Sequence, residues 1–315
     1  MKILSINNKL KNMNYLCVGA CHIDNILKIQ KEYKLERTNP VNSTLKLGGV
    51  VSNIANNLKL FTKNTKLFSL PFEKNINTKF FTNKIKPIEI SNSINDSFYN
   101  AILDKNGKLI IGLASNSTYE KIKNINFRKI NKFLKNENYL ILDLCFNQNL
   151  IEKIINYYYK KVKIYIAGTS IYKIHRIRKS LKFIDSLCLN EDELLALTKK
   201  NSLNSSINYI INKNKNINLS ITRSNKPAIM ILKNNKYLGT IPKIQVKNEN
   251  GAGDAFASMF FLTLSSKLHP SLILSYSIAF GCLKAMDFQY KKTKYFNKEF
   301  NRILKKVNIK KYEKQ

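Results

Sequence analysis

The residue pattern with the clearest chemical potential is Asn-Gly-Ala-Gly-Asp at residues 250–254. Glycine and alanine leave little side-chain bulk around the backbone, so several N–H groups can converge on one ligand. An apolar run follows at once and predicts a helix, whose N-terminus carries unpaired N–H donors and partial positive charge. Such a turn attracts phosphate oxygens and can stabilise charge that develops on a phosphoryl group in transfer.

Asp254 stands at this helix start, where we expect its carboxylate to stay ionised and to accept a hydrogen bond from an attacking hydroxyl. Phosphoryl transfer needs mainly positioning and charge stabilisation, which this turn can supply. An isolated acidic residue in the first turn of a helix more often serves only the helix dipole. A second glycine pair far upstream favours the catalytic interpretation. We therefore predict a catalytic group made of Gly251, Ala252, Gly253 and Asp254.

The second pair, Gly48 and Gly49, precedes residues 50–61, whose apolar residues recur at helical spacing. Gly49 permits close approach of a ligand, and Asn53 offers both a donor and an acceptor from that helix. Asp24 follows a short apolar run that is typical of a buried parallel strand. Open α/β sheets bind ligands at the carboxyl ends of such strands. Without the neighbouring glycines, Asn53 would be interpreted as an ordinary polar residue.

Asn190 and Glu193 follow another predicted strand and allow two interpretations. Asn at the N-cap with Glu three residues later forms a capping box. A carboxylate here could also act near Mg²⁺ and nucleotide phosphates, because Mg²⁺ prefers carboxylates, phosphates and water. Thr222 ends a further predicted strand, and Arg223 could supply positive charge to phosphates or lie in a solvated loop.

The segments around these residues alternate between strands and helices. Further strands are predicted at residues 66–70, 139–144, 162–166, 183–189 and 218–222, with helical or mixed segments between them. This alternation implies crossover connections and a parallel sheet. Residues 254–264 and 271–286 predict strongly apolar, buried helices, and the basic tail from Lys291 predicts a surface helix. We expect one α/β domain over residues 1–315, with its central, mostly parallel sheet in a three-layer α/β/α arrangement.

Two segments predict a small β-lid. Residues 25–47 alternate weakly between apolar and polar residues, which is typical of exposed strands. Residues 98–114 contain Asn106-Gly107 between two apolar runs, a good hairpin signal. We expect the two segments to close over a substrate and to exclude water.

The composition narrows the class of protein. With 44% hydrophobic residues in 315, the chain can bury a substantial core, which excludes a disordered protein. A net charge of +34 suits a nucleic-acid partner, but the basic residues are scattered and no Arg-rich arm or RNA-binding aromatic motif is present. Abundant Lys, Asn and Ile favour A/T-rich coding drift instead. We expect no specific nucleic acid, and an RNA-associated protein is the least favoured alternative.

The cysteines and histidines predict no metal or disulfide framework. Five irregularly spaced cysteines indicate buried, reduced thiols, as in a cytoplasmic protein. The three histidines form no recognisable cluster, and we assign none of them a catalytic role. The polar N-terminus lacks the apolar core of a signal peptide, and no run approaches the ~20 apolar residues of a membrane helix. We therefore expect a cytoplasmic protein without a membrane partner.

The chain resembles the ribokinase-like (PfkB-type) carbohydrate kinases, roughly from Tyr15 to Met286, and among them most resembles the pseudouridine kinases. The family patterns match residues 19–24 (Gly-Ala-Cys-His-Ile-Asp), 48–55 (Gly-Gly-Val-Val-Ser-Asn-Ile-Ala) and 250–255. The Gly-Gly-Val start, Asn39-Pro40 upstream and Asn248 are features similar to those of pseudouridine kinases. Ribokinases usually have Lys at the position of Val50.

The resemblance implies a ribokinase-like fold, ATP and Mg²⁺ as cofactors, and a small-molecule nucleoside or sugar as substrate. It implies that the substrate is held by Asp24, Gly48, Gly49 and Asn53. It implies that Asn190 and Thr222 lie near ATP, to which we add Arg223 for its charge, and that Glu193 acts near the metal. It leaves open a monovalent cation and a homodimer formed through the lid.

The implied enzyme is a phosphotransferase with an alcohol acceptor, which phosphorylates the 5′-hydroxyl of pseudouridine to give pseudouridine 5′-phosphate and ADP. A ribokinase or another sugar or nucleoside kinase of the family is one alternative. A binding-only descendant is another, because residues 71–74, 167–168 and 223–227 depart from the family pattern. The kinase interpretation requires the helix start after Gly253 to face a pocket edged by Asp24 and Asn53.

Overall fold

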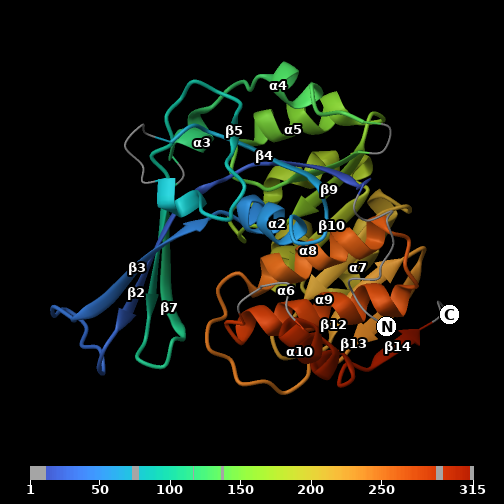
Figure 1. The fold of residues 1–315 in the computed structure, drawn as a ribbon. Coiled ribbons are helices and arrows are strands. Elements are labelled where there is room, and N and C mark those ends of the chain that lie inside the picture. The colour runs from blue at the N-terminus through green and yellow to red at the C-terminus, as the bar shows by residue number, and fades with distance from the viewer. Residues whose placement is uncertain (1–11, 73–77, 116, 136–137, 289–293, 313–315) are drawn as a thin grey trace.

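The computed structural model describes residues 12–72, 78–115, 117–135, 138–288 and 294–312. A large sheet lies between two layers of helices, and a small sheet projects from one side of this body (Figure 1). The departures at Glu73 and Lys74 and the start of the basic tail at Lys291 lie outside the described residues.

The large sheet has the order β14-β13-β12-β11-β10-β9-β8-β1-β4-β5. Its strands are β1 (Asn14–Val18), β4 (Asn64–Ser69), β5 (Ile88–Glu89), β8 (Asn138–Leu142), β9 (Lys163–Ala167), β10 (Ser186–Asn190), β11 (Asn218–Thr222), β12 (Ala228–Leu232), β13 (Asn235–Gly239) and β14 (Ile309–Tyr312). Neighbours from β5 to β11 run parallel, and the pairs from β11 to β14 run antiparallel. The mostly parallel sheet is confirmed, and the antiparallel edge was not predicted.

Helices cover both faces of the large sheet. One layer contains α2 (Val50–Leu58), α8 (Ala252–Ser265), α9 (Pro270–Ala285) and α10 (Lys294–Leu304). The other contains α3 (Ser117–Lys121), α4 (Phe127–Asn131), α5 (Gln148–Tyr158), the 3₁₀ helix η3 (Ile174–Phe183), α6 (Glu191–Thr198) and α7 (Leu203–Lys213). Side chains alternate between the two cores along each strand, so Tyr15 faces one layer and Leu16 the other. The three-layer arrangement is therefore confirmed.

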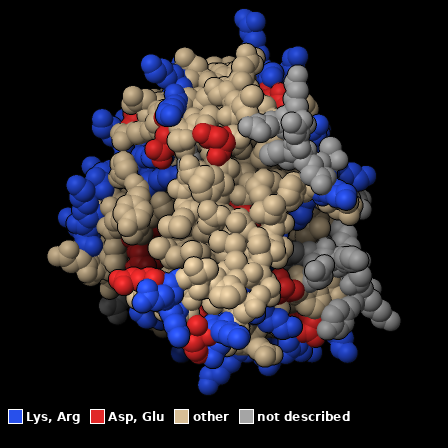
Figure 2. All heavy atoms as spheres, turned by 90° about the vertical axis from the view of Figure 1, so that its left-hand side faces the viewer, with Lys and Arg blue, Asp and Glu red and all other residues tan. Residues whose placement is uncertain are grey.

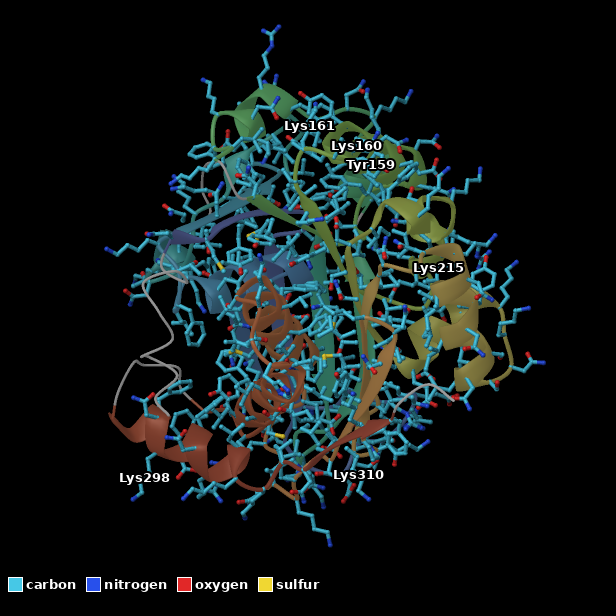
Figure 3. The ribbon with its side chains drawn as sticks, turned by 90° about the vertical axis from the view of Figure 1, so that its right-hand side faces the viewer. Tyr159, Lys160, Lys161, Lys215, Lys298 and Lys310 are labelled. Carbon is cyan, nitrogen blue, oxygen red and sulfur yellow. The ribbon has the colours of Figure 1, made fainter. Side chains whose placement is uncertain are left out.

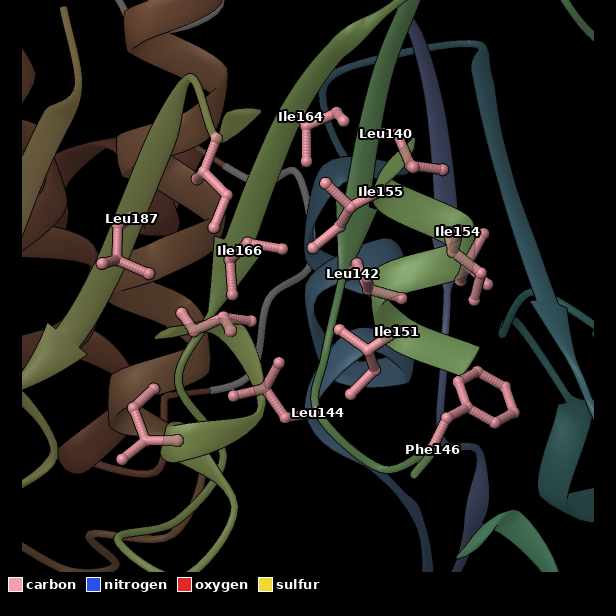
Figure 4. Packing of buried hydrophobic residues seen from close by; sticks show 14 of the residues in the cluster. Leu140, Leu142, Leu144, Phe146, Ile151, Ile154, Ile155, Ile164, Ile166 and Leu187 are labelled. Atoms are coloured by element: carbon pink, nitrogen blue, oxygen red, sulfur yellow. The ribbon is translucent and has the colours of Figure 1, made fainter. Parts of the chain in front are cut away.

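The second core shows why continuous apolar runs became parallel strands. Leu140 and Leu142 on β8 and Ile166 on β9 lie against Ile151 and Ile155 of α5 (Figure 4). All five side chains are essentially fully buried, and each such burial contributes roughly 1.5–3 kcal/mol. This packing fixes the carboxyl ends of β8 and β9 relative to the loops that follow them.

The small sheet consists of β2 (His22–Ile29), β3 (Val41–Gly48), β6 (Phe98–Leu103) and β7 (Leu109–Ser115), in the order β3-β2-β6-β7. The two segments that the sequence assigned to a lid, residues 25–47 and 98–114, supply most of these strands. The closing motion of the lid stays a prediction. Asp24 was expected at the carboxyl end of the first core strand. That expectation was wrong, because β1 ends at Val18 and Asp24 lies on β2.

Apolar residues of the small sheet reach the surface. Leu45 and the β7 residues Leu109, Ile111 and Leu113 are each 44–52% exposed. The face toward which this sheet projects carries a broad central area with few charged side chains (Figure 2). The opposite face carries scattered basic residues, including Lys215 between α7 and β11 (Figure 3).

The basic C-terminal segment forms the helix α10 at the surface, as predicted, and one apolar face of this helix packs on the first core. Phe296, Phe300 and Ile303 of α10 are buried in the first core, and the chain then adds β14 beside β13. All five cysteines are buried and free, as predicted. Among the helices of the described residues, none has the length and apolar character needed to cross a bilayer.

Candidate active site

Two helix starts that are far apart in the sequence meet in the structure. Asn53 on α2 donates a hydrogen bond from Nδ2 to Asp254 Oδ2 on α8 at 2.8 Å. Each helix begins after a glycine with positive φ, Gly49 at 99° and Gly251 at 77°. A Cβ on Gly253 would find nothing within 4 Å, so the start of α8 borders open space. The required juxtaposition of the Gly253 helix start with Asn53 is therefore present.

Asp254 differs from the sequence expectation in its ionisation. Burial, with smaller contributions from the negative charges of Asp24 and Asp143, raises the pKa of its carboxyl group to about 7. The hydrogen bond from Asn53 and the positive charge of Lys284 act in the opposite direction. A carboxyl group with a pKa near neutrality can take a proton from a hydroxyl and later release it. A pKa near 7 departs from the expectation that this carboxylate stays ionised at the helix start.

This pKa predicts a pH-dependent activity. If deprotonated Asp254 accepts the hydroxyl proton, kcat/KM should fall as the pH drops through about 7. Asn53→Ala removes the hydrogen bond that favours the charged form, so the acid limb should move to higher pH. Profiles of kcat/KM against pH check this, with Asn57→Ala on the same helix as control. An acid limb that stays in place in Asn53→Ala would contradict the prediction.

Asp24 lies at the base of the small sheet with its side chain largely buried. Its Oδ1 is 2.9 Å from His22 Nδ1, yet neither atom makes a well-directed hydrogen bond within the described residues. An acceptor hydroxyl would supply such a partner for the carboxylate. A Cβ on Gly48 would lie only 2.0 Å from Asp24 Oδ1, so the absence of a side chain at Gly48 makes room for this carboxylate.

His22 was not recognised from the sequence as a neighbour of the site. The sequence signal that could have found it is the two-residue spacing between His22 and Asp24, since residues two apart on a strand point to the same side. Asp24 also faces Lys46 across β3 and Tyr99 across β6 in the sheet register. The small sheet therefore surrounds Asp24 with polar and charged side chains.

Asp143, directly after β8, is a second residue that sequence reasoning missed. Its fully buried carboxylate accepts hydrogen bonds from the backbone N–H groups of Ala20, Val51 and Cys145 at 3.0, 3.3 and 3.1 Å. The α2 helix has no side-chain cap of its own, so Asp143 supplies one from across the sheet. The start of α2, and with it Asn53, is held in place by this carboxylate.

Asn190 and Glu193 form the capping box that one of the two interpretations predicted. Asn190 Oδ1 accepts from Glu193 N at 2.8 Å, and Glu193 Oε2 accepts from Asn190 N at 2.9 Å. The Glu193 side chain is buried, and a Cβ on Gly168 would lie 2.2 Å from its Oε2. Burial raises the pKa of this carboxyl group to about 7. Direct ligation of a metal by Glu193 does not fit this enclosed position, and a water-mediated role stays a prediction.

Thr222 and Asn190 lie side by side at the carboxyl ends of β11 and β10. Thr222 Oγ1 donates to Leu189 O at 3.5 Å, and Arg223 Nε lies 3.0 Å from Glu191 Oε2. The positive charge of Arg223 is therefore already paired, and its contact with ATP stays a prediction. The α8 helix contacts both α2 and β10.

No group of three His, Cys, Asp or Glu residues in the described parts of the chain could hold a metal by itself. A magnesium ion that enters with ATP would take most of its ligands from phosphates and water. A cavity of about 300 Å³ lies elsewhere, between the end of α2 and the edge strands. Its lining includes Lys59, Lys63, Lys66 and Lys86, and none of the predicted catalytic residues.

A family model for the pfkB family of carbohydrate kinases matches residues 13–286. The chain belongs to the pfkB family. The match includes both glycine-rich helix starts and the strands that position them. A comparison with curated protein sequences found no match.

Solved structures share the fold of this pfkB-family chain. A carbohydrate kinase from Agrobacterium tumefaciens is 19% identical, with a TM-score of 0.71, covering 95% of this chain and 100% of that one. Arabidopsis thaliana ribokinase, solved with ribose and ATP, is 15% identical with a TM-score of 0.68, covering 93% and 99%. Phosphofructokinase-2 from Escherichia coli is 12% identical with a TM-score of 0.72, covering 93% and 98%. The ribokinase-like fold predicted from the sequence is thus confirmed.

Proposed function

We propose that the chain is an ATP-dependent kinase that transfers a phosphoryl group to a hydroxyl of a sugar or nucleoside. The observation that carries the proposal is the hydrogen bond between Asn53 and Asp254 beside the Gly251–Gly253 turn. It joins a residue suited to orienting a hydroxyl with a carboxyl group suited to receiving its proton. The turn next to them offers backbone N–H groups to phosphate oxygens. Family membership over residues 13–286 supports this function.

The proposed step is an in-line displacement. The acceptor hydroxyl oxygen forms a bond to the γ-phosphorus, and the bond from that phosphorus to the bridging oxygen of ADP breaks. The hydroxyl proton passes to Asp254, while Asp24 and Asn53 hold the acceptor by hydrogen bonds. The N–H groups at Gly251, Ala252 and Gly253 stabilise charge on the transferring group. Mg²⁺ bound with ATP would neutralise phosphate charge.

For the acceptor we propose the 5′-hydroxyl of pseudouridine. The support is the sequence pattern at residues 48–58, at Asn39-Pro40 and at Asn248. In the structure, Asn39 shapes the β2–β3 connection through hydrogen bonds to Lys34 and Arg37, and Asn248 Oδ1 accepts from Asn250 N at 2.9 Å. Asn248 thus shapes the catalytic turn itself. Other sugars or nucleosides remain the alternative acceptors within the family.

We also propose that the small sheet acts as a lid, since Asp24 at its base belongs to the acceptor pocket. Closing it over the acceptor would exclude water from the phosphoryl group. Its exposed apolar residues, such as Leu109, Ile111 and Leu113, are where a second copy would pack if the chain forms a homodimer. A monovalent-cation site stays an open implication of the family resemblance.

The direct test of the proposed function is an acceptor panel. ADP release should be measured with Mg-ATP and pseudouridine, uridine, ribose, adenosine or fructose as the acceptor. We expect turnover to be highest with pseudouridine. If turnover is highest with ribose, the chain has the acceptor specificity of a ribokinase instead. Pseudouridine binding by calorimetry without turnover on any acceptor would instead identify a binding-only protein and contradict the kinase function.

A further inference from the structure

Lys284, in the last turn of α9, lies against the catalytic turn. Its Cε is 3.2 Å from the position that a Cβ would take on Gly251, and Asp254 Oδ2 is 4.0 Å from the same position. The side chain of Lys284 therefore reaches the same side of Gly251 as the catalytic carboxyl group. Any phosphate held by the N–H groups of this turn would be within reach of a lysine ammonium.

No carboxylate oxygen of the described residues lies within 4.0 Å of the Lys284 ammonium group. The side chain is half-buried, and burial lowers the pKa of its ammonium group. The nearby charge of Lys46 also lowers this pKa, whereas the charges of Asp287 and Asp254 raise it. A partly buried ammonium without a close partner is unfavourable unless an anion joins it. The fold thus keeps a cation available at this turn.

Other positions are less suited to the same task. Val50 stands at the start of α2 where a lysine is usual in ribokinases, so this position supplies no charge. Arg223 is paired with Glu191 at 3.0 Å. Lys46 is exposed on β3 of the small sheet, opposite Asp24 in the register. Lys284, by contrast, lies against the turn itself.

We propose that Lys284 is a further catalytic residue, whose ammonium contacts the phosphoryl group in transfer and holds it beside Asp254. This proposal rests on the proposed kinase function. Lys284 stays protonated throughout the step and donates charge-assisted hydrogen bonds to phosphoryl oxygens. The proton of the acceptor hydroxyl still goes to Asp254, and the leaving group is still ADP.

The kinetic test compares Lys284→Met, Lys284→Arg and wild type. Lys284→Met should lower kcat about 100-fold while the acceptor KM changes little, because one charge-stabilising contact is lost in the transition state. Lys284→Arg keeps the charge and should recover part of the rate. Lys215→Met is the matched control, since Lys215 precedes β11 at the opposite end of the strand from the site (Figure 3).

A second readout separates catalysis from simple structural support. The charge of Lys284 favours ionised Asp254, so Lys284→Met should move the acid limb of kcat/KM to higher pH. Lys284→Arg should leave the limb in place. Loss of packing alone would lower the thermal midpoint without producing this charge-dependent difference between Met and Arg.

The closing experiment measures binding of inorganic pyrophosphate by calorimetry, which needs no turnover. We expect binding by wild type and Lys215→Met, and at least roughly tenfold weaker binding by folded Lys284→Met. An absence of turnover on every acceptor of the panel would contradict the proposed kinase function. The pyrophosphate measurement would still decide whether Lys284 binds phosphate. Equal binding by wild type and Lys284→Met, or none by wild type, would overturn the proposal.

Discussion

Asp254→Asn should lower kcat by roughly 1,000-fold, because the amide cannot accept the proton of the attacking hydroxyl. The amide keeps the shape of the carboxyl group, and its oxygen can still accept the 2.8 Å hydrogen bond from Asn53. The acceptor should therefore still bind, and calorimetry of acceptor binding checks this separately from ADP release. Asp104→Asn, in the turn between β6 and β7, is the matched control and should retain the wild-type rate.

The unfolding temperature of Asp254→Asn should show that its lower kcat results from a loss of catalysis and not from a loss of folding stability. Burial raises the folded pKa of Asp254 to about 7, above the value of about 3.9 for an unfolded chain. The stability that comes with the protonated form is therefore present at low pH and lost as the pH rises toward and through 7. The amide of Asp254→Asn does not ionise, so the variant does not lose this stability as the pH rises. Near pH 8 it should therefore unfold at or above the wild-type temperature. A variant that is inactive and clearly less stable near pH 8 would contradict this account.

Gly48→Ala should lower kcat/KM about 100-fold, mainly through a higher acceptor KM. A Cβ at this position would lie 2.0–2.2 Å from the Asp24 carboxyl atoms, so the carboxylate must turn away from the acceptor. The φ angle of Gly48 is not in the left-handed region, so alanine adds no backbone strain of that kind. Steady-state kinetics over a range of acceptor concentrations measures the effect. Ser43→Ala, at an exposed position on β3 of the same sheet, controls for general disturbance.

A double-mutant cycle identifies the cause of the Gly48→Ala effect. If the methyl group acts by displacing Asp24, Gly48→Ala should add little to the loss already caused by Asp24→Ala. Strictly additive losses from the two substitutions would show that Gly48 acts by another route. Such additivity would remove Asp24 from the acceptor pocket as described.

The parallel core could be predicted because strands buried on both faces appear as continuous apolar runs. The antiparallel edge from β11 to β14 was not predicted, and for its β12–β13 hairpin the reason is local. The β12–β13 hairpin turns through Lys233 and Asn234, whose φ angles are 49° and 64°, without the glycine that usually marks such a turn. β14 was missed because its pairing with β13 depends on residues some 70 positions away in the chain.

Part of the candidate site could also be predicted from the sequence, for a different reason. The glycines and Asp254 form contiguous motifs, so their chemistry can be read locally. The contacts made by Asp143 join residues up to 123 positions apart, and no local pattern reveals such partners. The raised pKa of Asp254 was also hidden, because it results from burial beside Asp24 and Asp143. Lys284 lies in an apolar helix, and only the packing of α9 brings it to Gly251.

We propose that the pocket around Asp254 transfers the γ-phosphate of ATP to an acceptor hydroxyl. Mass spectrometry of the acceptors after incubation with Mg-ATP tests it most directly. The wild-type chain should give a phosphorylated acceptor, and folded Asp254→Asn should leave the acceptor unchanged. Phosphorylation by Asp254→Asn at the wild-type rate, or no phosphorylated acceptor with the wild-type chain, would contradict the proposal.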